Sequence, residues 1–168
     1  TIQRIYKDQL SGLDQNSDKH GEINERLTEM LSRNEEIAKL MVEAFKNPPW
    51  NEVWSYERSY QRIEQLDDGK YTRCFVYMLD NKIAGVVCGK LITYVNDLDF
   101  MIEDFYIDPH CQRRGLGKKM MEALEECLPE VDNLTLLTGR EFYSADFYQK
   151  NGFKINDDMV FMVKKLKS

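Results

Sequence analysis

The sequence predicts an α/β domain with a mixed, mostly antiparallel central sheet and helices on both faces, in the order (β)ααβββαβαβ. Three observations support this fold class. Apolar residues recur at helical spacing before residue 67, and alternating strand-like segments follow between residues 73 and 107. The chain then returns to a strand–helix–strand order, whose crossover connection makes the sheet mixed.

The N-terminal residues carry the weakest pattern. Residues 1–21 are expected to form a poorly defined extension with one short helical face, and residues 22–31 favour a strand over a helix. The apolar residues of that short face are Ile2, Ile5, Tyr6 and Leu10.

Two helices are predicted next. Ser32-Arg33-Asn34-Glu35 matches a capping box, so the first helix is expected to begin there and to end before Pro48-Pro49. Ser55 is expected to cap the second helix, and Asp67-Asp68-Gly69 closes it.

Three strands are predicted after these helices. Residues 73–79 alternate, Asp80-Asn81-Lys82 form a tight turn, and residues 83–94 make the second strand. Asn96-Asp97 then turn the chain into a third strand over residues 98–107.

A glycine-rich loop follows Ile107 and opens a helix that Pro129 stops. Gly115 and Gly117 lie where this helix begins. Its predicted apolar face consists of Leu116, Met120, Ala123, Leu124 and Cys127. The expected remainder is a buried strand over 134–137, a helix over 141–150 capped by Asn151-Gly152, and a last strand over 159–164.

Strand, glycine loop and helix together predict an anion site. Backbone N–H groups at a helix start have no intrahelical acceptor, and the helix dipole favours negative charge. Four cations, Arg113, Arg114, Lys118 and Lys119, flank the glycines, so we expect a pyrophosphate here. The loop has no Ser or Thr after the lysine to hold Mg²⁺, which argues against a nucleotide triphosphatase.

Composition narrows the function classes. The 168 residues fit one domain, and a net charge of −6 argues against nucleic acid as a partner. The sequence shows no apolar run of membrane length and no secretory signal. Four cysteines without a C-x-x-C pair and two histidines make a metal site unexpected and favour reduced thiols in a cytoplasmic protein.

Three segments in one order resemble the GNAT superfamily of N-acetyltransferases. They are residues 102–107, the run Gln112-Arg113-Arg114-Gly115-Leu116-Gly117, and residues 146–153 with the element F-Y-x-x-x-G-F. The resemblance implies acetyl-CoA as co-substrate. Its pyrophosphate would meet the backbone of Gln112, Arg113, Arg114, Gly115, Leu116, Gly117 and Lys118, and its pantetheine would pair with Phe105, Tyr106 and Ile107.

The same resemblance suggests two catalytic residues. Tyr148 matches the family's general acid for the CoA thiolate, a task suited to a phenol, which is protonated at neutral pH. Glu103 is the candidate general base, and strand alternation predicts that it faces away from Asp104. Glu141 stands where the family commonly has an asparagine that contacts the cofactor. A core role for Tyr148 and a solvated role for Glu103 stay open.

The predicted acceptor is a small-molecule or peptide amine. Residues 97–108 hold five acids and no base, which suits a cation, and Asp97 and Asp99 are taken as binding residues. Trp50 and Trp54 lie in the loop that borders the acceptor site in the family. A non-catalytic acyl-CoA-binding module is the alternative, and a homodimer is compatible with either function.

Overall fold

The computed structural model describes residues 2–5, 20–111 and 115–167. These residues fall into two compact units, one ending at Leu137 and the other beginning at Thr138. Each unit is described by itself below. The single domain expected over residues 1–168 stays a prediction.

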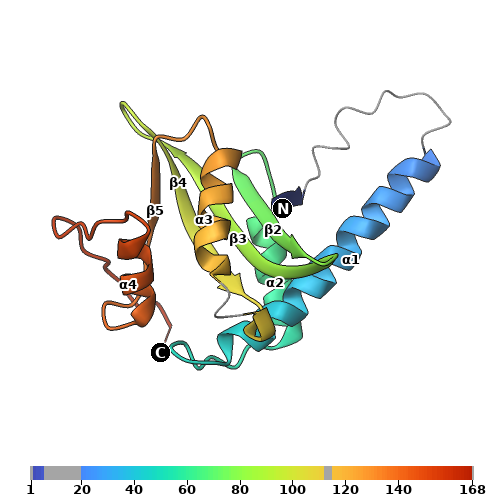
Figure 1. The fold of residues 1–168 in the computed structure, drawn as a ribbon, viewed down its shortest axis with the longest axis horizontal. Coiled ribbons are helices and arrows are strands. Elements are labelled where there is room, and N and C mark those ends of the chain that lie inside the picture. The colour runs from blue at the N-terminus through green and yellow to red at the C-terminus, as the bar shows by residue number, and fades with distance from the viewer. Residues whose placement is uncertain (1, 6–19, 112–114, 168) are drawn as a thin grey trace. The chain divides into compact units, whose positions relative to one another are not determined.

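A five-stranded sheet forms the middle of the first unit (Figure 1). The strands lie side by side in chain order, with three antiparallel pairings followed by one parallel pairing. They are β1 (Ile2–Ile5), β2 (Thr72–Leu79), β3 (Lys82–Thr93), β4 (Leu98–Ile107) and β5 (Asn133–Leu136). The predicted mixed, mostly antiparallel sheet is confirmed.

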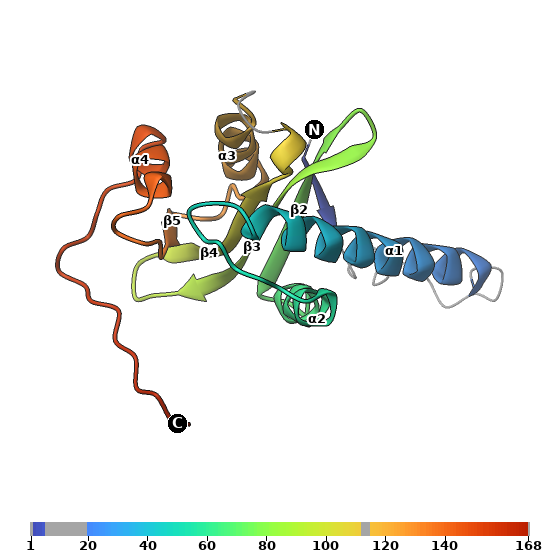
Figure 2. The ribbon, with the colours of Figure 1, turned by 90° about the horizontal axis from the view of Figure 1, so that it is seen from below.

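Helices cover both faces of this sheet, as predicted. Figure 2 shows α1 (His20–Phe45) and α2 (Tyr56–Leu66) against one face and α3 (Leu116–Cys127) against the other. The second unit contains α4 (Tyr143–Lys150). None of the helices in the described ranges is both long and apolar enough to cross a membrane.

Local signals explain where several elements begin and end. The Ser55 hydroxyl accepts a hydrogen bond from the Arg58 N–H at 3.2 Å and so caps α2, as the sequence predicted. Asp80 and Asn81 both have positive φ, at 50° and 62°, which a two-residue hairpin turn requires. β4 has the predicted bounds, and β2 and β3 each begin one residue earlier than predicted.

The sheet separates two apolar cores. Residues of α1 and α2 pack on one face against Val76, Val86 and Tyr106. On the other face α3 lies so close to β3 that a Cβ at Gly85 would collide with Met120. The predicted apolar face of α3 is largely right, since Leu116, Met120 and Leu124 are buried. Cys127 is exposed instead, and Met121 takes part in the core.

A β-bulge interrupts β4 at Glu103. Cys88 pairs with Asp104 and the next residue, Gly89, pairs with Ile102, which leaves Glu103 as the extra residue. Paired residues share a face of the sheet, and Cys88 and Gly89 point to opposite faces. Asp104 therefore faces α1 and α2, while Ile102 faces the α3 side.

The structure corrects three predictions for the N-terminal part of the chain. Residues 2–5 form β1 along the edge of β2 instead of a helical face. Residues 22–31 lie inside α1 instead of forming a strand, and the Ser32–Glu35 segment is helix interior instead of a helix start. The spacing of Ile23, Leu27 and Leu31 is itself helical, at i, i+4 and i+8. Pairing with β2 overrides the local pattern at residues 2–5.

The C-terminal predictions are also corrected. Residues 159–164 form no strand, and Met159, Phe161 and Met162 are 71–84% exposed. A strand needs a hydrogen-bonded neighbour, and no pairing in the described chain reaches this segment. β5 begins one residue earlier than predicted and is half-buried, because it is the edge strand beyond β4. The helix predicted over 141–150 begins at Tyr143.

Candidate active site

α3, the next α-helix along the chain after β4, has an N-terminus without a side-chain cap. Gly115 occupies the N-cap position with φ 70°, a left-handed conformation that glycine adopts without strain. Its side chain is absent, so no side-chain oxygen occupies the first N–H groups of the helix. Gln112, Arg113 and Arg114 lie outside the described residues.

The charge around this helix start suits an anion. The first turn of α3 holds Lys118 and Lys119 and contains no acidic residue. The space beside the Gly115 Cα is open, since an added Cβ would meet nothing within 4 Å. The Lys118 Nζ lies 3.9 Å from the carboxylate of Glu122, and both side chains are exposed. These features fit the pyrophosphate of a CoA thioester.

β5 pairs with only the first part of β4. The pairing of β4 with β5 covers Asp99–Ile102 and stops before Glu103. The predicted pantetheine-contacting residues, 105–107, lie beyond that point. Tyr106 turns its side chain into the core, 5.3 Å from the Phe45 ring, so only its backbone can take part in such a contact.

Glu103 lies on the α2 side of the sheet, which corrects the predicted alternation. Its Oε1 lies 3.7 Å from the Lys90 Nζ, and Lys90 shares a face with Cys88 because they are two residues apart on β3. Asp104 faces the same side through its own pairing with Cys88. The bulge removes the alternation that would have separated the two carboxylates.

Asp104 is engaged by a single arginine. The Arg62 guanidinium of α2 donates to both carboxylate oxygens: Nε to Oδ1 at 3.1 Å and to Oδ2 at 2.9 Å, and Nη2 to Oδ1 at 2.8 Å. The Asp104 side chain is 6% exposed, against 27% for Glu103. The hydrogen bonds to Asp104 raise the pKa of Arg62, which stays charged. Glu103 is therefore the better placed of the two carboxylates to meet a substrate.

The two tryptophans gather around the end of α1. The Phe45 ring lies 5.0 Å from Trp50, 6.5 Å from Trp54 and 5.3 Å from Tyr106. The Trp54 indole N–H donates to Glu52 at 2.9 Å. The ring of Tyr56 lies 6.1 Å from the ring of Tyr60. Trp50 and Trp54 are both half-buried, so each packs on the core and still presents part of its ring.

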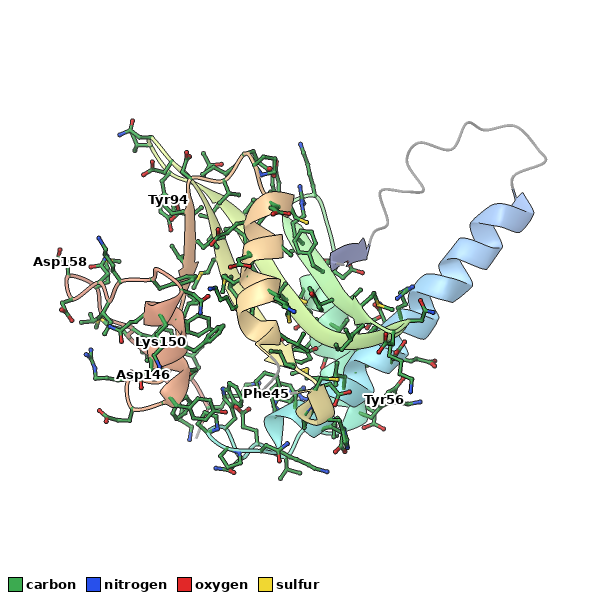
Figure 3. The ribbon with its side chains drawn as sticks, viewed as in Figure 1. Phe45, Tyr56, Tyr94, Asp146, Lys150 and Asp158 are labelled. Carbon is green, nitrogen blue, oxygen red and sulfur yellow. The ribbon has the colours of Figure 1, made fainter. Side chains whose placement is uncertain are left out.

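Asp97 and Asp99 lie at the other end of β4. Asp99 lies four positions before Glu103, about 13 Å along the strand. Asp99 accepts a hydrogen bond from the Asn133 amide at 2.8 Å, and Asp97 lies in the exposed turn after β3. Figure 3 labels Tyr94 beside this turn and Phe45 at the opposite end of the sheet. The structure does not bring these two acids together with Glu103.

Tyr148 belongs to the second unit, where it helps to end α4. The Phe153 N–H donates to the Tyr148 carbonyl at 3.0 Å, and the Gly152 N–H donates to the Gln149 carbonyl at 3.1 Å. With Gly152 at φ 91°, this is a Schellman motif, and the Tyr148–Phe153 ring contact at 5.4 Å completes it. The F-Y-x-x-x-G-F element thus has a structural basis, and it fixes the backbone of Tyr148.

The family model for the acetyltransferase (GNAT) domain matches residues 70–155, just over half of the 168 residues. This chain belongs to the GNAT family. The match extends from the segment before β2 to just beyond the Schellman motif, so it contains the β4 bulge, the start of α3 and Tyr148. The family is one of acetyltransferases.

Named GNAT relatives act on amines. A curated protein named "Probable spermine N(1)-acetyltransferase" from Bacillus subtilis subsp. natto (strain BEST195) is 35% identical over 39% of this chain. The match spans 49% of that relative, so the chain covers about half of its length.

Solved structures share the fold. An aminoglycoside acetyltransferase, meta-AAC0020 from an uncultured soil metagenomic sample, in complex with sisomicin, has a TM-score of 0.67 at 17% identity, over 99% of this chain and 96% of that one. AAC(6')-Iy in complex with a CoA-containing bisubstrate analogue has a TM-score of 0.64 at 16% identity, over 98% and 97%.

The described side chains form no group of three or more His, Cys, Asp and Glu that could hold a metal ion. Sequence reasoning missed Lys90, which contacts Glu103, and Arg62, which contacts Asp104. The position of Arg62 within a polar helix gave no signal, because Arg58 and Arg62 look alike in the sequence and only the fold brings one of them to Asp104.

The first prediction concerns the helix start. Gly117→Val should raise the Kd for acetyl-CoA by about tenfold or more, because a branched side chain would separate the pyrophosphate from the backbone N–H groups. Gly69→Val is the matched control, since a Cβ at Gly69 would meet nothing within 4 Å. Calorimetry with acetyl-CoA measures both, and circular dichroism checks the fold. An unchanged Kd in a folded Gly117→Val variant would remove the cofactor from this loop.

Proposed function

We propose that this chain is an acetyl-CoA-dependent N-acetyltransferase that acetylates the amine of a small cationic acceptor or a peptide or lysine amine. The observation that carries the proposal is the start of α3, which has no side-chain cap and holds Lys118 and Lys119 in its first turn. The strand that precedes it in the chain, β4, pairs with β5 only as far as Ile102. Membership of the GNAT family supports acetyl-CoA as the donor.

The backbone would hold the donor. N–H groups from Gln112 to Lys118 would bind the pyrophosphate, and residues 105–107 would pair with the pantetheine arm. Lys118 adds positive charge beside the phosphates. When bound, acetyl-CoA supplies an acetyl group activated as a thioester.

Two side chains would move the protons. Glu103 would accept a proton from the acceptor amine, directly or through a water molecule, so that the nitrogen lone pair can attack the thioester carbonyl. Tyr148 would donate a proton to the sulfur as the carbon–sulfur bond breaks. The half-exposed position of Glu103 beside Lys90 supports its role, because Asp104 is already engaged by Arg62.

The acceptor would be a polycationic amine. The spermine acetyltransferase named above, with its 35% identity, supports a polyamine, and the fold of the aminoglycoside enzymes supports the same broad class. Trp50 and Trp54 would wall the acceptor site, and Asp97 and Asp99 would serve only an acceptor long enough to reach along β4. A cytoplasmic location and a homodimer stay predictions from the sequence.

A panel of amines tests this function. Spermine, an aminoglycoside, a lysine-containing peptide and an anionic amino acid are offered with acetyl-CoA, and free thiol is measured. We expect amine-dependent thiol release with the cationic acceptors and little with the anionic one. Glu141 at the position of the family's asparagine favours the second candidate, a non-catalytic acyl-CoA-binding module. Acetyl-CoA binding without thiol release for any amine would select that candidate.

Salt should weaken acceptor binding if acidic side chains attract the acceptor. We expect the KM for spermine to rise several-fold as the Debye length falls from about 30 Å at 0.01 M to about 8 Å at 0.15 M salt. The kcat at saturating spermine is the internal control and should stay nearly constant. A KM that does not respond to salt would count against an acidic acceptor site.

A further inference from the structure

Arg62 connects α2 to two parts of the candidate acceptor site. Its guanidinium holds both oxygens of Asp104 through three hydrogen bonds of 2.8 to 3.1 Å. The guanidinium carbon also lies 5.9 Å from the centre of the Trp54 ring. The Asp104 side chain is 6% exposed and that of Arg62 is 33% exposed, so water screens this pair poorly.

The bulge at Glu103 makes the Arg62–Asp104 contact important for the orientation of Glu103. Because the backbone of Glu103 has no pairing partner on β3, the sheet ladder does not fix the orientation of this residue. The next residue, Asp104, is fixed by a two-oxygen contact to a helix on the same face. A bidentate arginine–carboxylate pair restrains direction as well as distance. Arg62 also attracts the Glu103 carboxylate from the same side.

Resting on the proposed function, we propose that Arg62 is a positioning residue of the acceptor site: by clamping Asp104 beside the bulge and packing against Trp54, it fixes the direction of Glu103. Arg62 itself need not touch either substrate. Asp104 is occupied by Arg62, whereas Glu103 faces only the exposed ammonium of Lys90 among the described residues, at 3.7 Å, so Glu103 is the carboxylate left to meet a cationic amine.

A purely structural role is the competing explanation, and the two make different predictions. Replacing a buried ion pair by apolar residues of similar volume often leaves stability unchanged or raises it. Arg62→Met combined with Asp104→Leu therefore keeps the packing and the net charge while removing the clamp. If Arg62 only stabilised the fold, this double variant would keep full activity.

The test compares that double variant with the wild type. We expect its Tm and its Kd for acetyl-CoA to stay near wild type, and its kcat/KM for spermine to fall about tenfold at neutral pH, since a small misplacement of a catalytic group is costly. The loss should shrink at high pH, where free amine no longer needs a base. This pH profile would not change if the pair were only structural. Glu43→Gln combined with Lys46→Met, which removes an exposed ion pair at the end of α1, is the control.

Arg62→Lys provides a second test if the double variant fails to fold. It keeps the charge, loses the planar fork, and should lower kcat/KM for spermine with the same recovery at high pH. Wild-type kinetics in either folded variant would overturn the positioning role alone. A wild-type protein that releases no thiol with any amine would overturn the proposed function and this inference with it.

Discussion

Tyr148→Phe should lower turnover by roughly 10²-fold or more while leaving acetyl-CoA affinity unchanged. The substitution removes only the hydroxyl that would protonate the leaving thiolate. The ring stays, so the contact with Phe153 that completes the Schellman motif at the end of α4 is preserved. Steady-state thiol release gives the turnover, and calorimetry gives the affinity for acetyl-CoA.

The same helix offers the control for this variant. Tyr143→Phe also removes one phenol hydroxyl from α4, from a side chain that is 58% exposed. We expect its turnover to match wild type. Near-normal turnover in Tyr148→Phe would leave Tyr148 with the structural role of closing the helix and no part in the chemistry.

Glu103→Gln should lower kcat by about 10²-fold near pH 7 and by much less near pH 10. Glutamine keeps the shape of the side chain and cannot accept the proton of a protonated amine. As pH approaches the ordinary pKa of an alkylamine, about 10.4, the acceptor loses its proton to solvent and the base becomes unnecessary. A pH–rate profile with spermine measures this recovery.

Asp104→Asn distinguishes the role of Asp104 from that of the neighbouring carboxylate, Glu103. It removes the charge that Arg62 holds in a site with little solvent, so its Tm should fall, whereas Glu103→Gln should leave the Tm near wild type. Its kcat should fall less than that of Glu103→Gln. A larger loss of kcat from Asp104→Asn at an unchanged Tm would assign the base to Asp104, and equal losses without recovery at high pH would point to another group.

The elements whose ends are marked by capping or turn residues could be predicted from the sequence. The cap at Ser55, the Asp80-Asn81 turn and the glycines at the start of α3 act over a few residues, so the pattern alone predicts them. β1 depends on a partner far away in the chain, the edge of β2, and its own residues favoured a helix. The apolar run at 159–164 looks like a strand, but a strand requires a neighbour that the sequence does not specify.

The directions of the side chains at the candidate site could not be predicted from the sequence. Strict alternation placed Glu103 and Asp104 on opposite faces, because a bulge leaves no mark in a run such as Ile102-Glu103-Asp104-Phe105. Only the register between β3 and β4 reveals it. Arg62 was missed for a related reason, since its pairing with Asp104 spans 42 positions of sequence.

The most direct test of the central claim is a product balance with spermine and acetyl-CoA. Free thiol and acetylated spermine are quantified together over time, the first by a thiol reagent and the second by mass spectrometry. Transfer to the amine predicts one acetylated amine for each thiol released, with no thiol above background when spermine is omitted. Thiol release without acetylated amine, or acetyl-CoA binding with neither product for any amine of the panel, would contradict it.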